Sequence, residues 1–548
     1  MPKADIRWMP WGPDAFEAAR ASGRPLLVLL SAFWAAGESA SLRARLENGL
    51  AGLPAPDRFV FVEADADRAP DLRLRYSPGQ VPSAFAISAD GTLLARLTSL
   101  DPSRLRTVLA GVAAASVGLT SERAGLGTCA VPLVPPGEEN LERGIETLEA
   151  FREAVQAALV RSTAPYLPVQ ARSSALHFLL GRAAQTGDEE GVAWVVDRFH
   201  ELAHSPLYDA VEGGFFGKME PSGPRTFKLL GQNAEWLILA LRLSRNPGAA
   251  FAPSLARGIL HYLQNRLLMP GGAFGHAQQD VPGYYRLTGE ERRRVPSPEV
   301  DPTVYTAPNA LAVRALCKGW RLLGEPAYLD QALRTYAFLT SSVILPGGDV
   351  AHAFDGTASG MGYIEDALEM GRAGLALYHS TLDPRYLDDV RLMAAKVAKD
   401  FKNPAGEGFL DLLPEAQPEG VPKRPVSDRA LNAQAAAFLL LASAQLEEES
   451  WAAGARGALG ALVDDPGDDL EALSLAGSAL LVALSPMAVF EAITDGSREQ
   501  RFQIMERLRQ IGVSDAVVTH RCPAPREGMQ RLPRLVGTCG NQRHEILV

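Results

Sequence analysis

Four ionisable side chains follow glycine-rich segments and could move protons. His276 and His352 each follow a Gly-Gly pair, and two such histidines can act as acid and base in the epimerisation of a sugar. The alternative is that both are solvated or cap helices. Glu365 and Asp366 follow the segment AHAFDGTASGMG and stand where a helix should begin. Adjacent helix positions point about 100° apart, so we expect one carboxyl group to contact a ligand and the other to cap the helix.

Residues 31–42, SAFWAAGESASL, form a second place where chemistry is expected. They follow an apolar run over residues 25–30 that is typical of a buried strand, and they precede a helix. In a thioredoxin-like fold such a corner carries two redox cysteines, because the helix N-terminus lowers the pKa of the first thiol. Residues 31–42 contain no cysteine, so no thiolate is available there for disulfide exchange.

The elements around this corner predict an α/β domain over residues 1–118, in which helical and strand-like segments alternate. Pro82, in GQVPSAF, stands where thioredoxin-like folds commonly have a cis-proline; a rigid entry to a strand is the alternative. Residues 119–135 are rich in glycine and proline, which indicates a linker.

Residues 136–485 are mostly helical in pattern, and they repeat. Gly214 and Gly272 are 58 residues apart, and so are Gly348 and Gly406. A unit of helix, turn, helix and glycine-rich loop is a helical hairpin, and about six such units fit this region. Six hairpins predict a closed toroidal α/α barrel, whose last hairpin, near residues 470–484, packs against its first, near residues 141–160. An open solenoid is the alternative. The segment 281–298 predicts an inserted loop, and residues 486–548 a small α/β appendage.

Composition excludes several classes of protein. The formal net charge of -10 and the pI of about 5.6 argue against a nucleic-acid-binding surface. The four cysteines contain no C-x-x-C pair, which predicts neither a metal site nor a dithiol. No uninterrupted apolar run reaches about 18 residues, and the first residues do not form a signal peptide. We therefore expect a cytoplasmic protein that contacts no membrane, with no cofactor.

Several segments in order resemble one known family. IRWMPWGPDAFEAARASGRPLLV, FVEADADRAPDLRLRY, GGAFGHAQQDVPGYYRLTGEE and GYIEDALEMGRAGLALYHSTLDPRYL are similar to segments of the YyaL-like proteins, bacterial relatives of the spermatogenesis-associated thioredoxin-domain protein. The resemblance implies a thioredoxin-like domain followed by a six-hairpin barrel, which is similar to the barrels of N-acylglucosamine 2-epimerases and six-hairpin glycosidases. The family has no firmly established reaction.

The sequence also departs from this family. The family's C-x-x-C positions fall on Ala35 and Glu38, or on Glu38 and Ser41, depending on the alignment. Residues that the family usually has as histidine or carboxylate are replaced here, by Phe216, Arg225, Phe227, Gln278 and, within the family's Asp-Trp-Asn-Gly motif, Ala307. Glutamine and phenylalanine cannot serve as general acid or base near neutral pH, so the sequence indicates a degenerate member.

The polar residues that remain at the expected barrel mouth are candidate ligand contacts: Lys228, Asn233, Asp280, Asn309, Glu365 and Asp366. The alternative for Asn233, Asn309 and Asp366 is that they cap helix N-termini. Three hypotheses follow. The first is a redox-inactive protein whose barrel binds a sugar-like small molecule, with catalysis lost or residual. The second is an active isomerase, epimerase or glycosidase-like enzyme. The third is an interaction module that holds a protein partner on its thioredoxin-like face.

Overall fold

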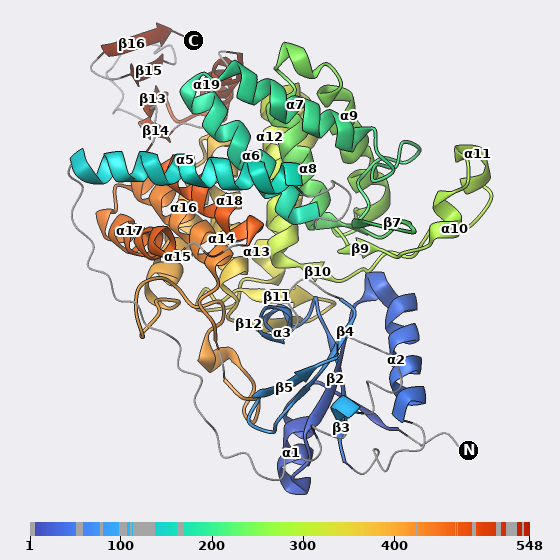
Figure 1. Ribbon diagram of the computed structural model, residues 1–548. Helices are drawn as coiled ribbons and strands as arrows, with labels where there is room; N and C mark the ends of the chain where they lie inside the picture. Colours follow the sequence, from blue (N-terminus) through green and yellow to red (C-terminus); the bar gives the residue numbers. More distant parts are fainter. Residues whose placement is uncertain are drawn as a thin grey trace.

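The chain is described here from a computed structural model, in which an α/β domain and a small terminal sheet lie at opposite ends of a ring of helices (Figure 1). The described residues are 6–50, 58–76, 81–97, 107–109, 112, 138–161, 169–423, 425–465, 467, 469–484, 489–510, 517–521, 534–539 and 542–547. The expected linker, residues 119–135, lies outside them. None of the described helices is long and apolar enough to cross a membrane.

A five-stranded mixed sheet forms the centre of the first domain. Its strands, in spatial order, are β1 (Trp8–Pro10), β3 (Val60–Asp65), β2 (Leu26–Ser31), β4 (Ser83–Ile87) and β5 (Leu93–Arg96). β3 runs parallel to β1 and β2, whereas β4 is antiparallel to β2 and β5. The Val81–Pro82 peptide bond that leads into β4 is cis.

Helices cover both faces of this sheet, which explains why the central strand is apolar throughout. Leu26, Val28 and Leu30 of β2 pack in one core cluster, and Leu27 and Leu29 pack in another. Alternate side chains of a strand point to opposite faces, so a strand covered on both sides needs a continuous apolar run. The covering helices are α1 (Pro13–Ser22), α2 (Ala36–Leu50) and α3 (Pro70–Tyr76).

Twelve helices alternate along the chain between an inner and an outer layer. The inner helices are α6 (Val169–Thr186), α8 (Leu230–Leu243), α12 (Thr306–Leu323), α14 (Ile364–Thr381), α16 (Arg429–Leu446) and α18 (Leu470–Leu484). The outer helices are α5 (Glu138–Arg161), α7 (Glu189–Ala203), α9 (Ala252–Tyr262), α13 (Pro326–Ser342), α15 (Arg385–Lys399) and α17 (Glu449–Asp464). Each inner helix packs against the next inner helix along the chain.

The ring is closed, as the sequence predicts. α18 packs against both helices of the first hairpin, α5 and α6. Gly144 of α5 lies against Leu484, where an added Cβ would stand 3.2 Å from the leucine side chain. The apolar stripes of the terminal helices therefore cover each other, which an open solenoid would not allow.

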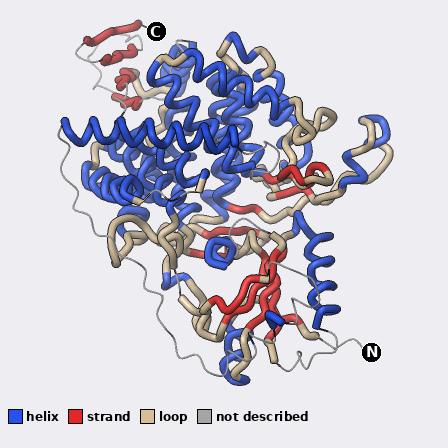
Figure 2. The backbone as a smooth tube through the Cα atoms, in the orientation of Figure 1, coloured by secondary structure: helices blue, strands red, loops and turns tan. Residues whose placement is uncertain are grey.

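Both ends of the ring are covered. Tyr363, which precedes α14, donates a hydrogen bond to Asp71 of α3 (2.9 Å), so the inner helices begin at the first domain. We call this end the mouth. Short strands lie between it and the first sheet (Figure 2): β6 (Lys218–Glu220), β7 (Gly223–Arg225), β8 (Lys228–Leu229), β9 (Ala277–Gln278), β10 (Val304–Tyr305), β11 (Ala351–Phe354) and β12 (Ala358–Met361).

The C-terminal segment covers the opposite end, the floor. It contains α19 (Arg498–Gln510) and a four-stranded sheet of β13 (Val489–Ile493), β14 (Val517–Arg521), β15 (Arg534–Cys539) and β16 (Gln542–Leu547). Gln445, near the end of α16, donates a hydrogen bond to the carbonyl oxygen of Val518 (2.9 Å). α19 packs against α14.

Candidate functional site

The corner at residues 31–42 is buried against the ring. The Trp34 ring stacks on Phe227 with centroids 4.3 Å apart, and the Trp34 carbonyl oxygen accepts a hydrogen bond from the Asp280 N–H (3.2 Å). Of the three positions aligned with redox cysteines, Ala35 lies in the interface core, Glu38 pairs with Arg225, and Ser41 is exposed. The face that would carry redox chemistry is thus an interdomain contact.

Asp280, an expected ligand contact, is used within the protein. Its Oδ2 accepts a hydrogen bond from Arg225 Nε (2.6 Å), and its Oδ1 accepts from the Thr226 N–H and hydroxyl (2.8 and 2.6 Å). Arg225 also pairs with Glu38 of the first domain. Asp280 and Arg225 therefore join the two domains.

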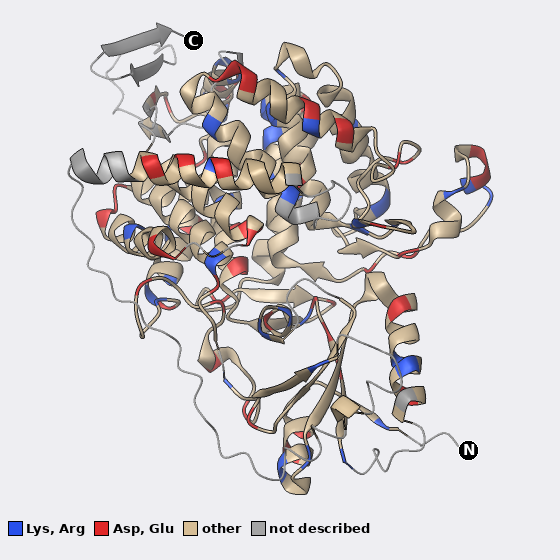
Figure 3. Ribbon diagram, viewed as in Figure 1, with Lys and Arg blue, Asp and Glu red and all other residues tan. Residues whose placement is uncertain are grey.

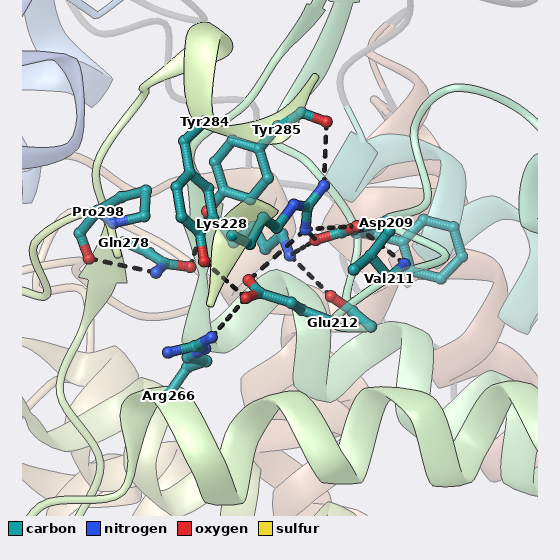
Figure 4. A network of polar contacts seen from close by, with 12 residues as sticks. Asp209, Val211, Glu212, Lys228, Arg266, Gln278, Tyr284, Tyr285 and Pro298 are labelled. Atoms are coloured by element: carbon teal, nitrogen blue, oxygen red, sulfur yellow. Dashed lines mark hydrogen bonds and ion pairs between the residues drawn. The ribbon is translucent and has the colours of Figure 1, made fainter. Parts of the chain in front are cut away.

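Lys228, another expected ligand contact, is fully buried within a network of polar contacts (Figure 4). Its ammonium donates to Asp209 (2.8 Å) and to the Gly213 carbonyl oxygen (2.7 Å). Three aromatic rings, those of Phe216, Tyr262 and Tyr285, surround it at 4.5–5.0 Å. Burial lowers the pKa of Lys228 to about 8, although Asp209 opposes the shift. No part of its side chain is accessible, so it stabilises the fold.

Asn233 and Asn309 hold the glycine-rich loops in place. Asn233 Oδ1 accepts from the Phe215 N–H (2.7 Å), and its Nδ2 donates to the Phe215 carbonyl oxygen (3.1 Å). Asn309 does the same to Phe274 (2.8 and 3.0 Å). Asn432, which the sequence reasoning missed, does so to Phe409 (2.7 and 3.0 Å). We call these three residues the asparagine clamps.

Two of the clamps stand against the glycine that precedes the clamped phenylalanine, Gly214 and Gly408. Gly408, which precedes the clamped Phe409, has φ +91°, and an added Cβ would stand 2.4 Å from Asn432 Oδ1. Only glycine tolerates both the conformation and the close approach. Asn233 and Asn309 therefore anchor loops rather than cap their own helices, and we do not propose them as ligand contacts.

Replacing Asn309 with alanine is expected to lower the free energy of unfolding by about 3 kcal/mol, because two buried backbone groups of Phe274 lose their partners. Asn432→Ala should behave alike. The control is Asn265→Ala, an exposed helical asparagine whose side chain contacts only His261, with an expected loss below about 1 kcal/mol. Urea unfolding measures all three, and equal losses at Asn309 and Asn265 would contradict the clamp.

His276 and His352 converge at the mouth, where a loop of the first domain lies between them. His352 Nδ1 is 2.8 Å from Asp366 Oδ2, and its Nε2 is 2.8 Å from the Asp67 carbonyl oxygen. His276 Nε2 is 3.4 Å from Asp67 Oδ2. The Tyr305 ring lies between the imidazoles, with centroids at 4.5 and 5.3 Å.

Carboxylates beside these histidines raise the pKa of both rings. Burial lowers the pKa of each ring, but Asp366 outweighs burial at His352 and raises its pKa to about 9. Asp67 likewise raises the pKa of His276. An acid/base pair needs one neutral imidazole as the base. Both ring nitrogens of His352 are engaged, by Asp366 and by the Asp67 carbonyl oxygen, so His352 has no free ring nitrogen for the epimerisation role that the sequence predicts.

Glu365 and Asp366 point to different places. Asp366 is fully buried, and its Oδ1 accepts a hydrogen bond from the Ala307 N–H (3.1 Å) at the start of α12. It therefore caps the neighbouring inner helix, not its own helix as expected. Glu365 keeps accessible surface and lies within electrostatic reach of His352, Arg73 and Glu471.

The structure adds three residues to the mouth that sequence reasoning did not single out. Asp67 and Arg73 come from the first domain, and Glu471 is near the start of α18. Burial raises the pKa of Glu471 to about 7 and also raises the pKa of Glu365.

Within the described part of the chain, no group of three or more His, Cys, Asp or Glu side chains could hold a metal ion. Cys317 is buried and unpaired; Cys129 and Cys522 lie outside the described residues.

No family model and no curated protein matches this sequence. Several solved structures are similar in fold. A D-mannose isomerase has 12% sequence identity and a TM-score of 0.48, and the match covers 63% of this chain and 98% of that chain. Cellobiose 2-epimerase from Bacillus thermoamylovorans has 10% identity and a TM-score of 0.49, with 60% and 87% covered. A GH76 α-mannanase from Bacteroides thetaiotaomicron has 13% identity and a TM-score of 0.48, with 62% and 95% covered. At such identities the likeness concerns the fold and not the activity.

Proposed function

We propose that this chain binds a sugar-like, hydroxyl-rich small molecule at the mouth of the ring, between Glu365, Glu471 and Arg73. One observation carries the proposal. These side chains come from α14, α18 and α3, all three keep accessible surface, and none has a hydrogen bond or ion pair to another described residue. They lie within electrostatic reach of one another beneath the first domain.

The chemistry of these three groups suits hydroxyl groups. A hydroxyl both donates and accepts a hydrogen bond, and a partly protonated carboxyl group does the same. Burial raises the pKa of both carboxyl groups, that of Glu471 to about 7, so Glu471 has both forms near neutral pH. The Arg73 guanidinium adds donors on the opposite side.

We propose further that the first domain is a redox-inactive, thioredoxin-like scaffold of a degenerate YyaL-like protein. The strand order β1-β3-β2-β4-β5 and the cis bond at Pro82 support this proposal. The absence of cysteine from residues 31–42 leaves no nucleophile there for disulfide exchange. Since Trp34 of this corner packs on Phe227 of the ring, the same face is not free to hold a protein partner, which speaks against the interaction module.

A second candidate function is acid–base catalysis on the same ligand. The pKa of Glu471, raised to about 7, favours it, because a carboxyl group that titrates near pH 7 can both give and take a proton. Burial raises the pKa of the neighbouring Glu365 as well. This pair would replace the two histidines as the groups that handle protons. Deuterium uptake from D2O into a bound sugar would separate an isomerase or epimerase from a binding protein.

The test is a calorimetric screen of neutral mono- and disaccharides against the full chain. We expect at least one sugar to bind, and Glu365→Gln to weaken it about tenfold, since a charge-assisted hydrogen bond is lost. The control is Glu407→Gln, on an exposed loop, which should leave affinity unchanged. A sugar that binds Glu365→Gln as well as wild type would remove Glu365 from the site. No binding across the panel would overturn the proposal.

A further inference from the structure

The inner helices carry polar residues on the faces that point to the ring axis. On α14 these are Glu365, Glu369 and Arg372, spaced by four and three residues, so they share one face. Glu235 of α8 and Arg314 of α12 meet them, since both lie within electrostatic reach of Glu369. Both signs of charge thus occur on the ring helices (Figure 3).

These residues form layers of opposite charge. Glu365 and Glu471 are the second residues of α14 and α18, and Glu235 and Glu369 the sixth residues of α8 and α14. The cations lie deeper. Arg314 is the ninth residue of α12, and Arg372 the ninth of α14. Arg242 is the thirteenth residue of α8, and Lys318 the thirteenth of α12. At 1.5 Å per residue, the cations begin about 10 Å below Glu365. Along the inner helices, the carboxylates therefore lie nearer the mouth and the cations lie deeper.

Among the described residues, this part of the axis holds four cations, Arg314, Arg372, Arg242 and Lys318, and two carboxylates, Glu235 and Glu369. Arg314 and Arg372 both donate to the one carboxylate of Glu369 (2.6 and 2.8 Å). Burial lowers the pKa of Arg372, and the nearby Arg314 lowers it further, although Glu369 opposes both. Arg372 also donates to the Gln434 carbonyl oxygen (3.0 Å), whereas Arg314 uses only its Nη1 toward the described residues. The other N–H groups of Arg314 therefore remain as donors for a second anion.

His177 reports the same excess of positive charge. Burial together with Arg242, Lys318 and Arg314 lowers its pKa to about 3, so the imidazole is neutral. Its contacts agree: Arg242 donates to His177 Nδ1 (3.1 Å), and Nε2 lies 3.2 Å from the Glu235 carbonyl oxygen. This fits the neutral tautomer with the proton on Nε2.

The axis also leaves room beside these groups. Although six helices surround them, the side chain of Glu235 is 30% accessible, that of Arg314 26% and that of Arg372 16%. A packed protein interior leaves such side chains no accessible surface. The ring therefore leaves space for at least a water molecule beside Arg314 and Arg372.

We propose that Arg314 and Arg372 bind an oxyanion, a carboxylate or a phosphate group, on the ring axis below Glu365. Planar guanidiniums recognise both oxyanions through paired N–H donors. The identity of the whole ligand rests on the proposed function. If both sites hold one molecule, the ligand is an acidic sugar derivative whose hydroxyl groups contact Glu365 and whose anionic group contacts Arg314. The oxyanion site itself does not depend on the sugar.

Calorimetry with the full chain tests the site. The probes are glucose, glucuronate, glucose 6-phosphate and inorganic phosphate at fixed ionic strength. We expect one of the acidic sugars to bind at least tenfold more tightly than glucose, and inorganic phosphate to compete with it. Which acidic sugar binds distinguishes a carboxylate from a phosphate. Arg314→Gln should weaken the acidic sugar at least tenfold and leave glucose within twofold, whereas Arg257→Gln, on exposed outer helix α9, should change neither.

The outcomes separate the two proposals. Acidic sugars that bind no better than glucose, or that bind Arg314→Gln as tightly as wild type, would overturn the oxyanion site. If inorganic phosphate binds, Arg314→Gln weakens that binding and no sugar binds, the result would support the oxyanion site and overturn the sugar site. If Arg314→Gln does not fold, Arg372→Lys provides the variant, and competition by phosphate on the wild-type chain needs no variant at all.

Discussion

Replacing Asp209 with asparagine is expected to lower the free energy of unfolding by about 4 kcal/mol, because two buried cations lose their carboxylate. Asp209 is 4% exposed and accepts hydrogen bonds from Lys228 Nζ (2.8 Å) and twice from Arg292 Nη1 (3.0 and 2.8 Å). Arg292 comes from the inserted loop, so this contact also fastens that loop to the ring. Asparagine has the same shape but only one acceptor oxygen and no charge.

A double variant isolates the cause. Methionine at position 228 is apolar and fits among the three aromatic rings, so Asp209→Asn with Lys228→Met should recover about 2 kcal/mol of the loss. Asp349→Asn serves as the control, since Asp349 is 62% exposed and pairs with Lys396 at the surface, where a pair contributes under about 1 kcal/mol. Urea unfolding measures each variant. A loss at Asp209 no larger than at Asp349 would show that the network contributes little.

The fold could be predicted because its signals are periodic. The 58-residue spacing of glycines marks the hairpin loops. Gly408, two residues after Gly406, shows why such a loop needs glycine, because the clamp from Asn432 leaves no space for a side chain there. The apolar run at residues 25–30 likewise reports a strand covered on both faces. Both signals can be read from the order of residue types along the chain, without knowledge of tertiary contacts.

The candidate site was predicted less well, because residue type does not give direction. Lys228 and Asp280 are polar residues next to rim loops, yet both turn into the protein and bond there. Asp366 caps the neighbouring inner helix α12, and no spacing within its own helix indicates that partner. Glu365, which shares the same start of α14, faces the axis instead.

The residues that were missed come from two sources. Asp67 and Arg73 reach the mouth only because the first domain docks there, and no pattern in the chain encodes that docking. The axial residues did leave a signal. Glu369 and Arg372 continue the face of Glu365 along a helix that is otherwise apolar, and a charged stripe on a buried helix predicts a polar axis.

As pH rises from 6.5 to above 9, the free energy of unfolding is expected to fall in the wild type by about 3 kcal/mol more than in His352→Gln. Asp366 and the Asp67 carbonyl oxygen accept hydrogen bonds from both ring nitrogens, which requires the imidazolium form. The folded pKa of about 9 lies above the unfolded value near 6.5. A raised pKa contributes stability that is complete below pH 6.5 and is lost as pH rises through 9.

Urea unfolding at pH 6.5, 7.5, 8.5 and 9.5 measures this loss for wild type, His352→Gln and His261→Gln. His261 is an exposed histidine on α9, so its variant should follow the wild type at every pH. Burial also raises the pKa of Asp411 to about 6 and that of Glu471 to about 7, but these groups are common to all three proteins and cancel in the differences. If His352→Gln loses as much stability as wild type over this range, the imidazolium does not hold the first domain on the ring, and a neutral His352 becomes available at the mouth as a base.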